Sequence, residues 1–150
     1  TLHITFVGGW FEMALPLGAM QEIGDMPTIT PLPHLPAWIK GIVQIRGEIL
    51  SVVDFQKLFQ LREDRRRSLK SSYILFAQDD LKFCLSVNRI TGILNVDEQY
   101  DRLDACSPDE QQHCAEMLEF INGVLVQDAR RIFILDSAAL GSTPKIRQWR

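Results

Sequence analysis

The sequence has few residues of the kinds that build covalent frameworks or reactive centres. Its three cysteines are odd in number and none falls in a CxxC pair, so the sequence predicts neither a disulfide framework nor a zinc site. Its three histidines are scattered, and no HExxH or GxSxG pattern surrounds them. We therefore expect no catalytic residues, no metal and no cofactor, and hence no enzyme. These cysteines and histidines are Cys84, Cys106, Cys114, His3, His34 and His113.

Long apolar runs and an excess of positive charge are also missing. No run approaches the roughly 18 apolar residues that a membrane span needs, and no secretory signal pattern is present, which predicts a cytoplasmic protein without direct membrane insertion. The net charge is −3, and the densest basic run, residues 62–67, contains two acids. Nucleic-acid binding requires a basic face, so we expect no nucleic-acid partner.

What the chain does contain is enough apolar sequence for a real core. It has 150 residues, of which 46% are hydrophobic and 23% charged. That composition is typical of one globular domain, and it argues against disorder.

The chain also contains an internal repeat. At an offset of 70 residues, the segments 11–23 and 81–93 align their apolar positions, including Leu15 with Leu85 and Ile23 with Ile93. At an offset of 82 residues, segment 39–58 aligns with segment 121–140. We infer that two copies of one module make up the chain.

Short apolar runs rich in β-branched and aromatic residues predict strands, and short Gly-containing or acidic connectors predict hairpins. The fold class predicted is mainly all-β, with two pseudo-repeated five-stranded SH3-like barrels and short helices. The first barrel is expected at residues 1–61 and the second at 72–140, with a tail at 141–150. The expected strands are Leu2–Val7, Trp10–Leu15, Ile39–Ile45, Ile49–Val53, Ser72–Phe76, Leu81–Val87, Ile93–Val96, Val124–Val126 and Ile132–Leu135.

Two aspartates recur at equivalent places in the modules. Asp54 and Asp136 both stand where a strand gives way to a short helix. A carboxylate at that position accepts hydrogen bonds from the first backbone N–H groups of the helix. We therefore predict two helix N-caps and remove both acids from any list of catalytic candidates.

One hairpin corner differs between the modules. The first has Arg46-Gly47 where the second has Asp128-Ala129, so the shared fold does not require the arginine. A surface charge in a turn is the plain interpretation. The competing one is a protein interface, in which Glu22 pairs with Arg46 beside apolar Met20 and Ile23.

The segments "AMQEI", "ITPLPHLPAWIKGIVQIRGEILSVVDFQKLF" and "INGVLVQDARRIFILDSAAL" resemble the CheW-like domain, the coupling module of bacterial chemosensory arrays. The resemblance implies a single CheW-like domain over residues 1–150 that acts as a scaffold. Its expected partners are the cytoplasmic tip of chemoreceptors, the regulatory domain of a CheA-type histidine kinase, and other CheW-like domains. It also implies a position beside membrane-embedded receptor arrays, in chemotaxis or type IV pilus signalling.

By resemblance and residue type together, nine residues are predicted to bind receptor or kinase: Met20, Glu22, Ile23, Gly41, Arg46, Gly47, Ile90, Ile93 and Gly123. For Gly123, a strand position that needs no side chain explains the residue at least as well. The chain departs from the family pattern at Ser51, Cys84 and Asn88. These departures predict a divergent member. The alternative hypothesis is a small-barrel module that binds oligonucleotides.

Overall fold

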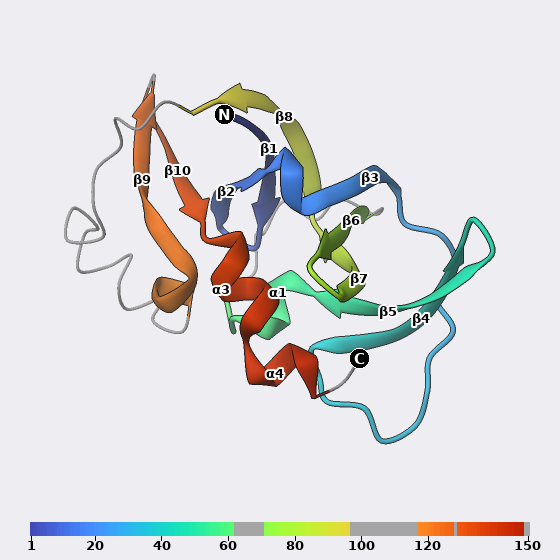
Figure 1. The fold of residues 1–150 in the computed structure, drawn as a ribbon. Coiled ribbons are helices and arrows are strands. Elements are labelled where there is room, and N and C mark those ends of the chain that lie inside the picture. Colours follow the sequence, from blue (N-terminus) through green and yellow to red (C-terminus); the bar gives the residue numbers. More distant parts are fainter. Residues whose placement is uncertain (62–70, 97–116, 128, 149–150) are drawn as a thin grey trace.

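The computed structural model describes residues 1–61, 71–96, 117–127 and 129–148. The described chain is mainly β, with two five-stranded sheets and a few short helices, which confirms the predicted fold class (Figure 1). The first-half strands are β1 Leu2–Gly8, β2 Phe11–Pro16, β3 Met20–Asp25, β4 Ile39–Ile45 and β5 Glu48–Asp54. The second-half strands are β6 Ser72–Gln78, β7 Leu81–Val87, β8 Arg89–Asn95, β9 Ile121–Gln127 and β10 Arg130–Leu135. The helices are η1 Leu17–Ala19, α1 Phe55–Leu58, η3 Met117–Phe120, α3 Ser137–Ser142 and α4 Pro144–Arg147.

The two sheets have the same topology. Sheet 1 has the order β8-β1-β2-β10-β9, and sheet 2 has the order β3-β6-β7-β5-β4. Replacing each strand of sheet 1 by its repeat partner, β1 by β6 and so on, gives the order of sheet 2. The repeat found in the sequence is therefore a repeat in space as well.

Each sheet nevertheless draws strands from both halves, so the expected assignment of one barrel to 1–61 and the other to 72–140 is wrong. The exchange occurs at two parallel contacts: β10 pairs with β2, and β5 pairs with β7. The offsets reveal which strands are copies of each other. They carry no information on which copy a strand pairs with, since equivalent strands present equivalent apolar faces.

The sequence reasoning missed one strand, β3, and placed the start of another, β8, too late in the chain. No strand was predicted for residues 20–25, which form β3, and β8 begins at Arg89, four residues before the expected strand Ile93–Val96. Both strands have an edge position, alternate in exposure along their length, and contain a bulge, at Gln21 and at Thr91. These two bulges are 70 residues apart, as the repeat requires.

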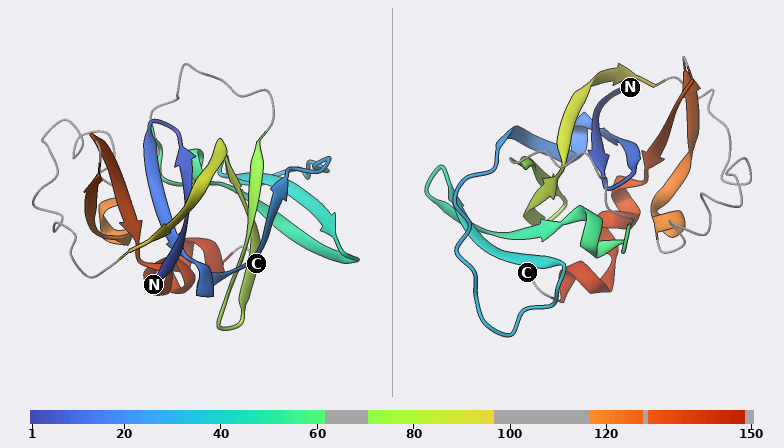
Figure 2. Two further views of the ribbon diagram at one scale, coloured as in Figure 1. Left: turned by 90° about the horizontal axis from the view of Figure 1, so that it is seen from above. Right: turned by 180° about the vertical axis from the view of Figure 1, so that it is seen from behind.

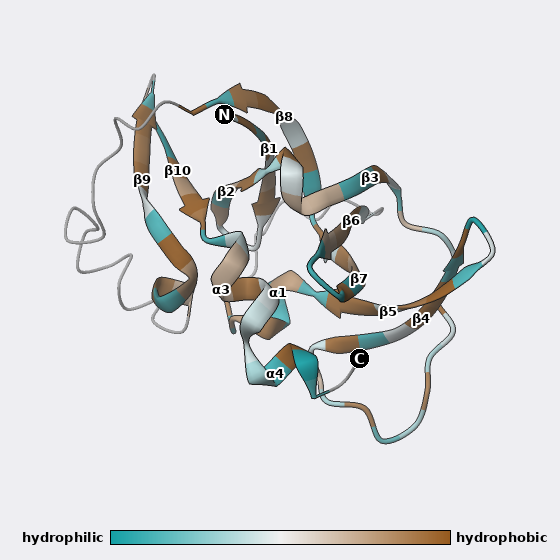
Figure 3. Ribbon diagram, viewed as in Figure 1, coloured by the Kyte–Doolittle hydropathy of each residue, from teal (hydrophilic) through white to brown (hydrophobic). Residues whose placement is uncertain are grey.

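A large apolar cluster joins the two sheets, and each sheet also encloses a smaller cluster of its own. The helix that follows each exchanged strand packs against the other sheet. After β5 of sheet 2, α1 brings Phe55 against Phe6 of sheet 1, with ring centroids 5.2 Å apart. After β10 of sheet 1, α3 lies over sheet 2, where a Cβ on Gly141 would lie 3.6 Å from Phe76. Figure 1 shows α1 and α3 near the middle of the molecule, and Figure 3 shows apolar residues spread through the strands of both sheets.

Both predicted helix caps are present. Asp54 Oδ1 accepts from the backbone N–H of Lys57 at 3.2 Å, and Asp136 Oδ1 accepts from that of Ala139 at 3.1 Å. The two aspartates are thus explained by the start of a helix.

The expected tail packs on the domain as far as the structure describes it. In α4, Ile146 is buried, Lys145 Nζ donates to the carbonyl of Leu58 at 3.0 Å, and Arg147 pairs with Asp80 at 3.0 Å. The acidic link 97–116, the basic run 62–67, Cys106, Cys114 and His113 lie outside the described residues. Among the helices that are described, none combines the length and the apolar character that a membrane crossing requires.

Candidate protein-interaction site

The hairpin between β4 and β5 turns on two residues with left-handed backbone conformations. Ile45 pairs with Glu48, and between them Arg46 has φ +53° and Gly47 has φ +79°. Two-residue hairpin turns of this kind favour Asn or Gly at the first position, because a side chain with a Cβ is strained there. An arginine at this corner is therefore unfavourable for the fold. The hairpin tip is hydrophilic and projects to the periphery (Figures 2 and 3).

The expected ion pair between Arg46 and Glu22 is present. Arg46 Nε donates to Glu22 Oε2 at 3.0 Å, and the Arg46 side chain is 83% exposed whereas that of Glu22 is 19% exposed. The pair joins the turn to β3 across the end of sheet 2. The other carboxylate oxygen, Glu22 Oε1, is buried and has no hydrogen-bond partner within the described structure.

The Glu22 carboxylate acts on two neighbouring groups in the interior of sheet 2. Burial, and then the negative charge of Glu22, raise the pKa of Tyr73. The same two causes raise the pKa of the Cys84 thiol to about 12. Cys84 is thus protonated at neutral pH and is a small, unreactive core residue.

A groove opens beside this ion pair, with a volume of about 330 Å³. Its apolar lining comes from Ile45 and Leu75, which are 8% and 4% exposed. We call it the Arg46 groove, defined by its lining residues Gln21, Glu22, Ile45, Arg46, Glu48, Leu75 and Lys82. A short apolar surface between charged side chains is suited to a protein partner.

The described residues give no support to a metal site or to the oligonucleotide alternative. No group of three or more His, Cys, Asp or Glu side chains in them is placed to hold a metal. His3 is buried, and burial lowers its pKa. The aromatic residues Phe6, Phe76 and Phe133 are at most 1% exposed, so they are closed to stacking with bases, as the oligonucleotide alternative would require.

Comparison with known proteins gives the family. The model of the CheW-like domain matches residues 4–144. The chain belongs to the CheW-like domain family. Chemotaxis protein CheW of Treponema pallidum is 26% identical over 148 residues, covering 97% of this chain and 84% of that protein. Protein PilI of Pseudomonas aeruginosa is 29% identical over 123 residues, covering 79% of this chain and 62% of that protein.

A solved structure has the same fold. The scaffolding protein TtCheW of Thermoanaerobacter tengcongensis superposes with a TM-score of 0.71 and 23% sequence identity, covering 89% of this chain and 87% of that chain. At this sequence identity, the similarity is evidence for a shared fold alone.

The nine residues predicted in this CheW-like chain do not all lie in one place. Glu22 and Arg46 line the Arg46 groove, and Gly47 completes its turn. The others lie along four strands: Met20 and Ile23 in β3, Ile90 and Ile93 in β8, Gly41 in β4 and Gly123 in β9.

The apolar members of this set differ in exposure. Met20 and Ile90 pack, half-buried, against the core between the sheets, whereas Ile23 and Ile93 are 41% and 65% exposed. Ile23 and Ile93 are repeat partners, and one lies on the edge strand of each sheet. They are therefore available for contact on both edge strands.

Gly41 has a structural explanation. Its φ is +146°, and a Cβ there would lie 2.2 Å from the carbonyl oxygen of Thr30. Thr30 forms a bridge with Ile42 through two backbone hydrogen bonds of 2.8 and 2.9 Å, which covers the edge of β4. Gly41 is buried, so this close approach of the backbone accounts for the glycine.

Sequence reasoning missed the other residues that line the Arg46 groove, which are Gln21, Ile45, Glu48, Leu75 and Lys82. A signal was present in the alignment of the two modules. At the two offsets Lys82 aligns with Glu12 and Glu48 with Arg130, so both charges reverse between the copies.

Proposed function

We propose that this chain is a non-enzymatic adaptor that couples the cytoplasmic tip of chemoreceptors to the regulatory domain of a CheA-type histidine kinase. It would act in the cytoplasm, beside membrane-embedded receptor arrays, in chemotaxis or type IV pilus signalling. The Arg46 groove is the proposed receptor-binding surface. Other CheW-like domains are proposed as further partners, because the two sheets present repeated strand edges.

The observation that carries the proposal is Arg46 itself. A non-glycine residue in a left-handed conformation costs about 1–2 kcal/mol, and an exposed ion pair returns at most about 1 kcal/mol. The arginine therefore gains little for the fold from its place in the turn. Backbone strain that the fold does not need is found most often at functional sites.

The geometry of Arg46 suits a protein partner. Glu22 binds Nε, which orients the guanidinium group, and the side chain remains 83% exposed. Arginine held in this way presents a planar group of N–H donors on an apolar stem, and arginine is enriched among the residues that dominate binding energy.

The names of relatives supply the biological setting for the proposal. They include chemotaxis proteins CheW, the protein PilI and a scaffolding protein. Taken as a proposal for this chain, they favour a scaffold in chemosensory signalling, with either motility system as its output.

The test is a binding assay with a purified receptor-tip fragment and, separately, with the kinase regulatory domain. We expect Arg46→Glu to lower receptor affinity at least tenfold, because it places two carboxylates side by side in the groove, and Arg46→Ala to lower it less. Arg130→Ala is the matched control, since Arg130 also forms an ion pair with a glutamate, on sheet 1.

Retained affinity for the kinase domain would show that the Arg46 variants are folded. An Arg46→Glu variant that binds the receptor tip as tightly as wild type would refute the proposed receptor surface.

A further inference from the structure

The Arg46 groove contains a second ion pair to which the proposed function has assigned no role. Lys82 Nζ lies 2.6 Å from Glu48 Oε2, and the two side chains are 29% and 51% exposed. Lys82 comes from β7 and Glu48 from the start of β5, so this pair crosses the same parallel contact that joins the two halves of the chain. Two cations, Arg46 and Lys82, thus line one cavity.

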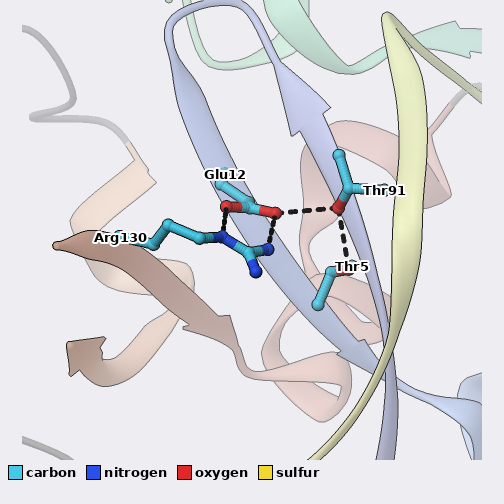
Figure 4. A network of polar contacts seen from close by, with 4 residues as sticks. All are labelled: Thr5, Glu12, Thr91 and Arg130. Carbon is cyan, nitrogen blue, oxygen red and sulfur yellow. Dashed lines mark hydrogen bonds and ion pairs between the residues drawn. The ribbon is translucent and has the colours of Figure 1, made fainter. Parts of the chain in front are cut away.

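The equivalent place on sheet 1 shows what the fold itself requires there. The repeat relates Lys82 to Glu12, Glu48 to Arg130, Gln21 to Thr91 and Leu75 to Thr5. These four sheet 1 residues, which we call the Glu12 network, contact one another directly (Figure 4).

Within the Glu12 network the polar groups satisfy one another. Arg130 donates to both carboxylate oxygens of Glu12, with Nε 3.0 Å from Oε1. The Thr91 hydroxyl donates to Glu12 Oε2 at 2.8 Å, and the hydroxyl oxygens of Thr91 and Thr5 lie 2.7 Å apart. The arginine is bound through two of its nitrogens and both carboxylate oxygens accept hydrogen bonds, so little is left for a partner to bind.

The Arg46 groove differs from the Glu12 network because it also contains Arg46, which leaves hydrogen-bond donors open. Glu22 engages Arg46 through Nε, and among the described residues the terminal guanidinium nitrogens have no hydrogen-bond partner, so they can donate to a ligand. Leu75 replaces Thr5, so the floor of the groove is apolar and makes no hydrogen bond to the charges above it. The second oxygen of Glu22, Oε1, is buried and makes no hydrogen bond within the described structure, so it does not occupy these donors.

Resting on the proposed function, we propose that Lys82 is a specificity-determining residue of the docking groove. The partner places a carboxylate between Arg46 and Lys82, and an apolar side chain beside it covers Ile45 and Leu75. Glu48 orients Lys82 in the way that Glu22 orients Arg46. The occupant is therefore an acidic and apolar segment of the receptor tip. Because the Glu12 network leaves little for a partner to bind, each molecule binds one such segment, at sheet 2.

The test compares Lys82→Met and Lys82→Arg in binding to the receptor-tip fragment. Methionine keeps the length and apolar stem of lysine but removes the charge, and we expect about a tenfold loss of affinity, as for one charge-assisted hydrogen bond. Arginine restores the charge and should restore most of the binding. Glu12→Gln, at the equivalent position of sheet 1, is the matched control and should bind as wild type does.

A second measurement identifies the chemistry on the partner. Each Glu and Asp of the receptor-tip fragment is replaced in turn by Gln or Asn. We expect one replacement to weaken binding to the wild-type chain about tenfold and to have no effect on binding to Lys82→Met.

The outcomes separate the two proposals. If Lys82→Met binds like wild type while Arg46→Glu does not, the role of Lys82 is wrong and the receptor surface stands. If Arg46→Glu also binds like wild type, the receptor surface falls as well. If no acidic replacement in the tip matters, the occupant is not a carboxylate.

Discussion

The two sheets share strand order, bulge positions and capped helices, yet their ends differ in chemistry. Sheet 1 ends in the Glu12 network, where hydroxyl groups, a carboxylate and a guanidinium group bind one another. Sheet 2 ends in the Arg46 groove, where an apolar floor separates two ion pairs. A repeated fold therefore fixes where such an end forms, and a few side chains decide whether it is closed or open to a partner.

The buried residues of the two sheets also differ in polarity. Of the equivalent buried positions, sheet 1 has His3 and Thr5 where sheet 2 has Tyr73 and Leu75. Sheet 1 is thus the more polar of the two at these positions, and both residues are hydrogen-bonded within the sheet, His3 to the carbonyl of Thr1 and Thr5 to Thr91.

The largest expected effect concerns the edge of sheet 2. Gly41→Ala should lower the free energy of unfolding by about 3 kcal/mol, because the new Cβ would meet the backbone of Thr30 at 2.2 Å. Urea unfolding would measure the change. A Gly18→Ala variant, whose Cβ would have no neighbour within 4 Å, serves as the control and should be close to neutral. An equally stable Gly41→Ala variant would show that the Thr30 bridge does not constrain β4.

Substitutions at the two hairpin corners should change stability by an intermediate amount, with opposite signs at the two corners. Gly47 and Ala129 are repeat partners with φ +79° and +64°. Gly47→Ala should destabilise the protein by about 1 kcal/mol, and Ala129→Gly should stabilise it by a similar amount, because only glycine adopts this backbone without strain. Thermal unfolding of both variants checks the prediction, and changes of the same sign in the two would break the equivalence of the corners.

The smallest expected effect concerns the Glu12 network. Burial alone would raise the pKa of Glu12, but hydrogen bonds from Arg130 and Thr91 outweigh it and lower that pKa below its ordinary value. A lowered carboxyl pKa adds stability above the unfolded-state pKa of about 4.3, and this stability is lost as the pH falls through the folded-state value.

Thr91→Val removes one of those hydrogen bonds, so the pKa of Glu12 should rise. The loss of stability between about pH 5 and pH 3 should then shrink by about 0.5 kcal/mol relative to wild type. Urea unfolding at a series of pH values would measure it. An unchanged pH dependence would show that Thr91 does not hold the Glu12 carboxylate.

Much of the fold was predictable from local patterns. Apolar runs located most strands, the two offsets revealed the repeat, and the caps at Asp54 and Asp136 followed from a carboxylate between strand and helix. The exchange of strands between halves was not predictable, because β5 and β10 carry similar apolar residues and either copy would fit either sheet. β3 was missed because residues 20–25 have only short apolar alternation, broken by a bulge at Gln21.

The candidate site was predictable in part. The contrast between Arg46-Gly47 and Asp128-Ala129 pointed to the corner, and Glu22 was expected as the partner of Arg46. Lys82 lies in a different half of the chain, and only the β5–β7 contact brings it to the groove. Gly41 was assigned to binding, although its close approach to Thr30, which no local pattern reveals, explains the residue.

The central claim, that one end of this repeated fold is the docking surface and the other is closed, is tested most directly by NMR. Backbone amide shifts of the ¹⁵N-labelled protein would be followed as a receptor-tip fragment is added. We predict the largest shift changes at Gln21, Ile45, Arg46 and Lys82, and small changes at Thr91, Gln127 and Glu12, the repeat partners of Gln21, Ile45 and Lys82. Equal changes at both ends, or larger ones at the Glu12 network, would contradict the account.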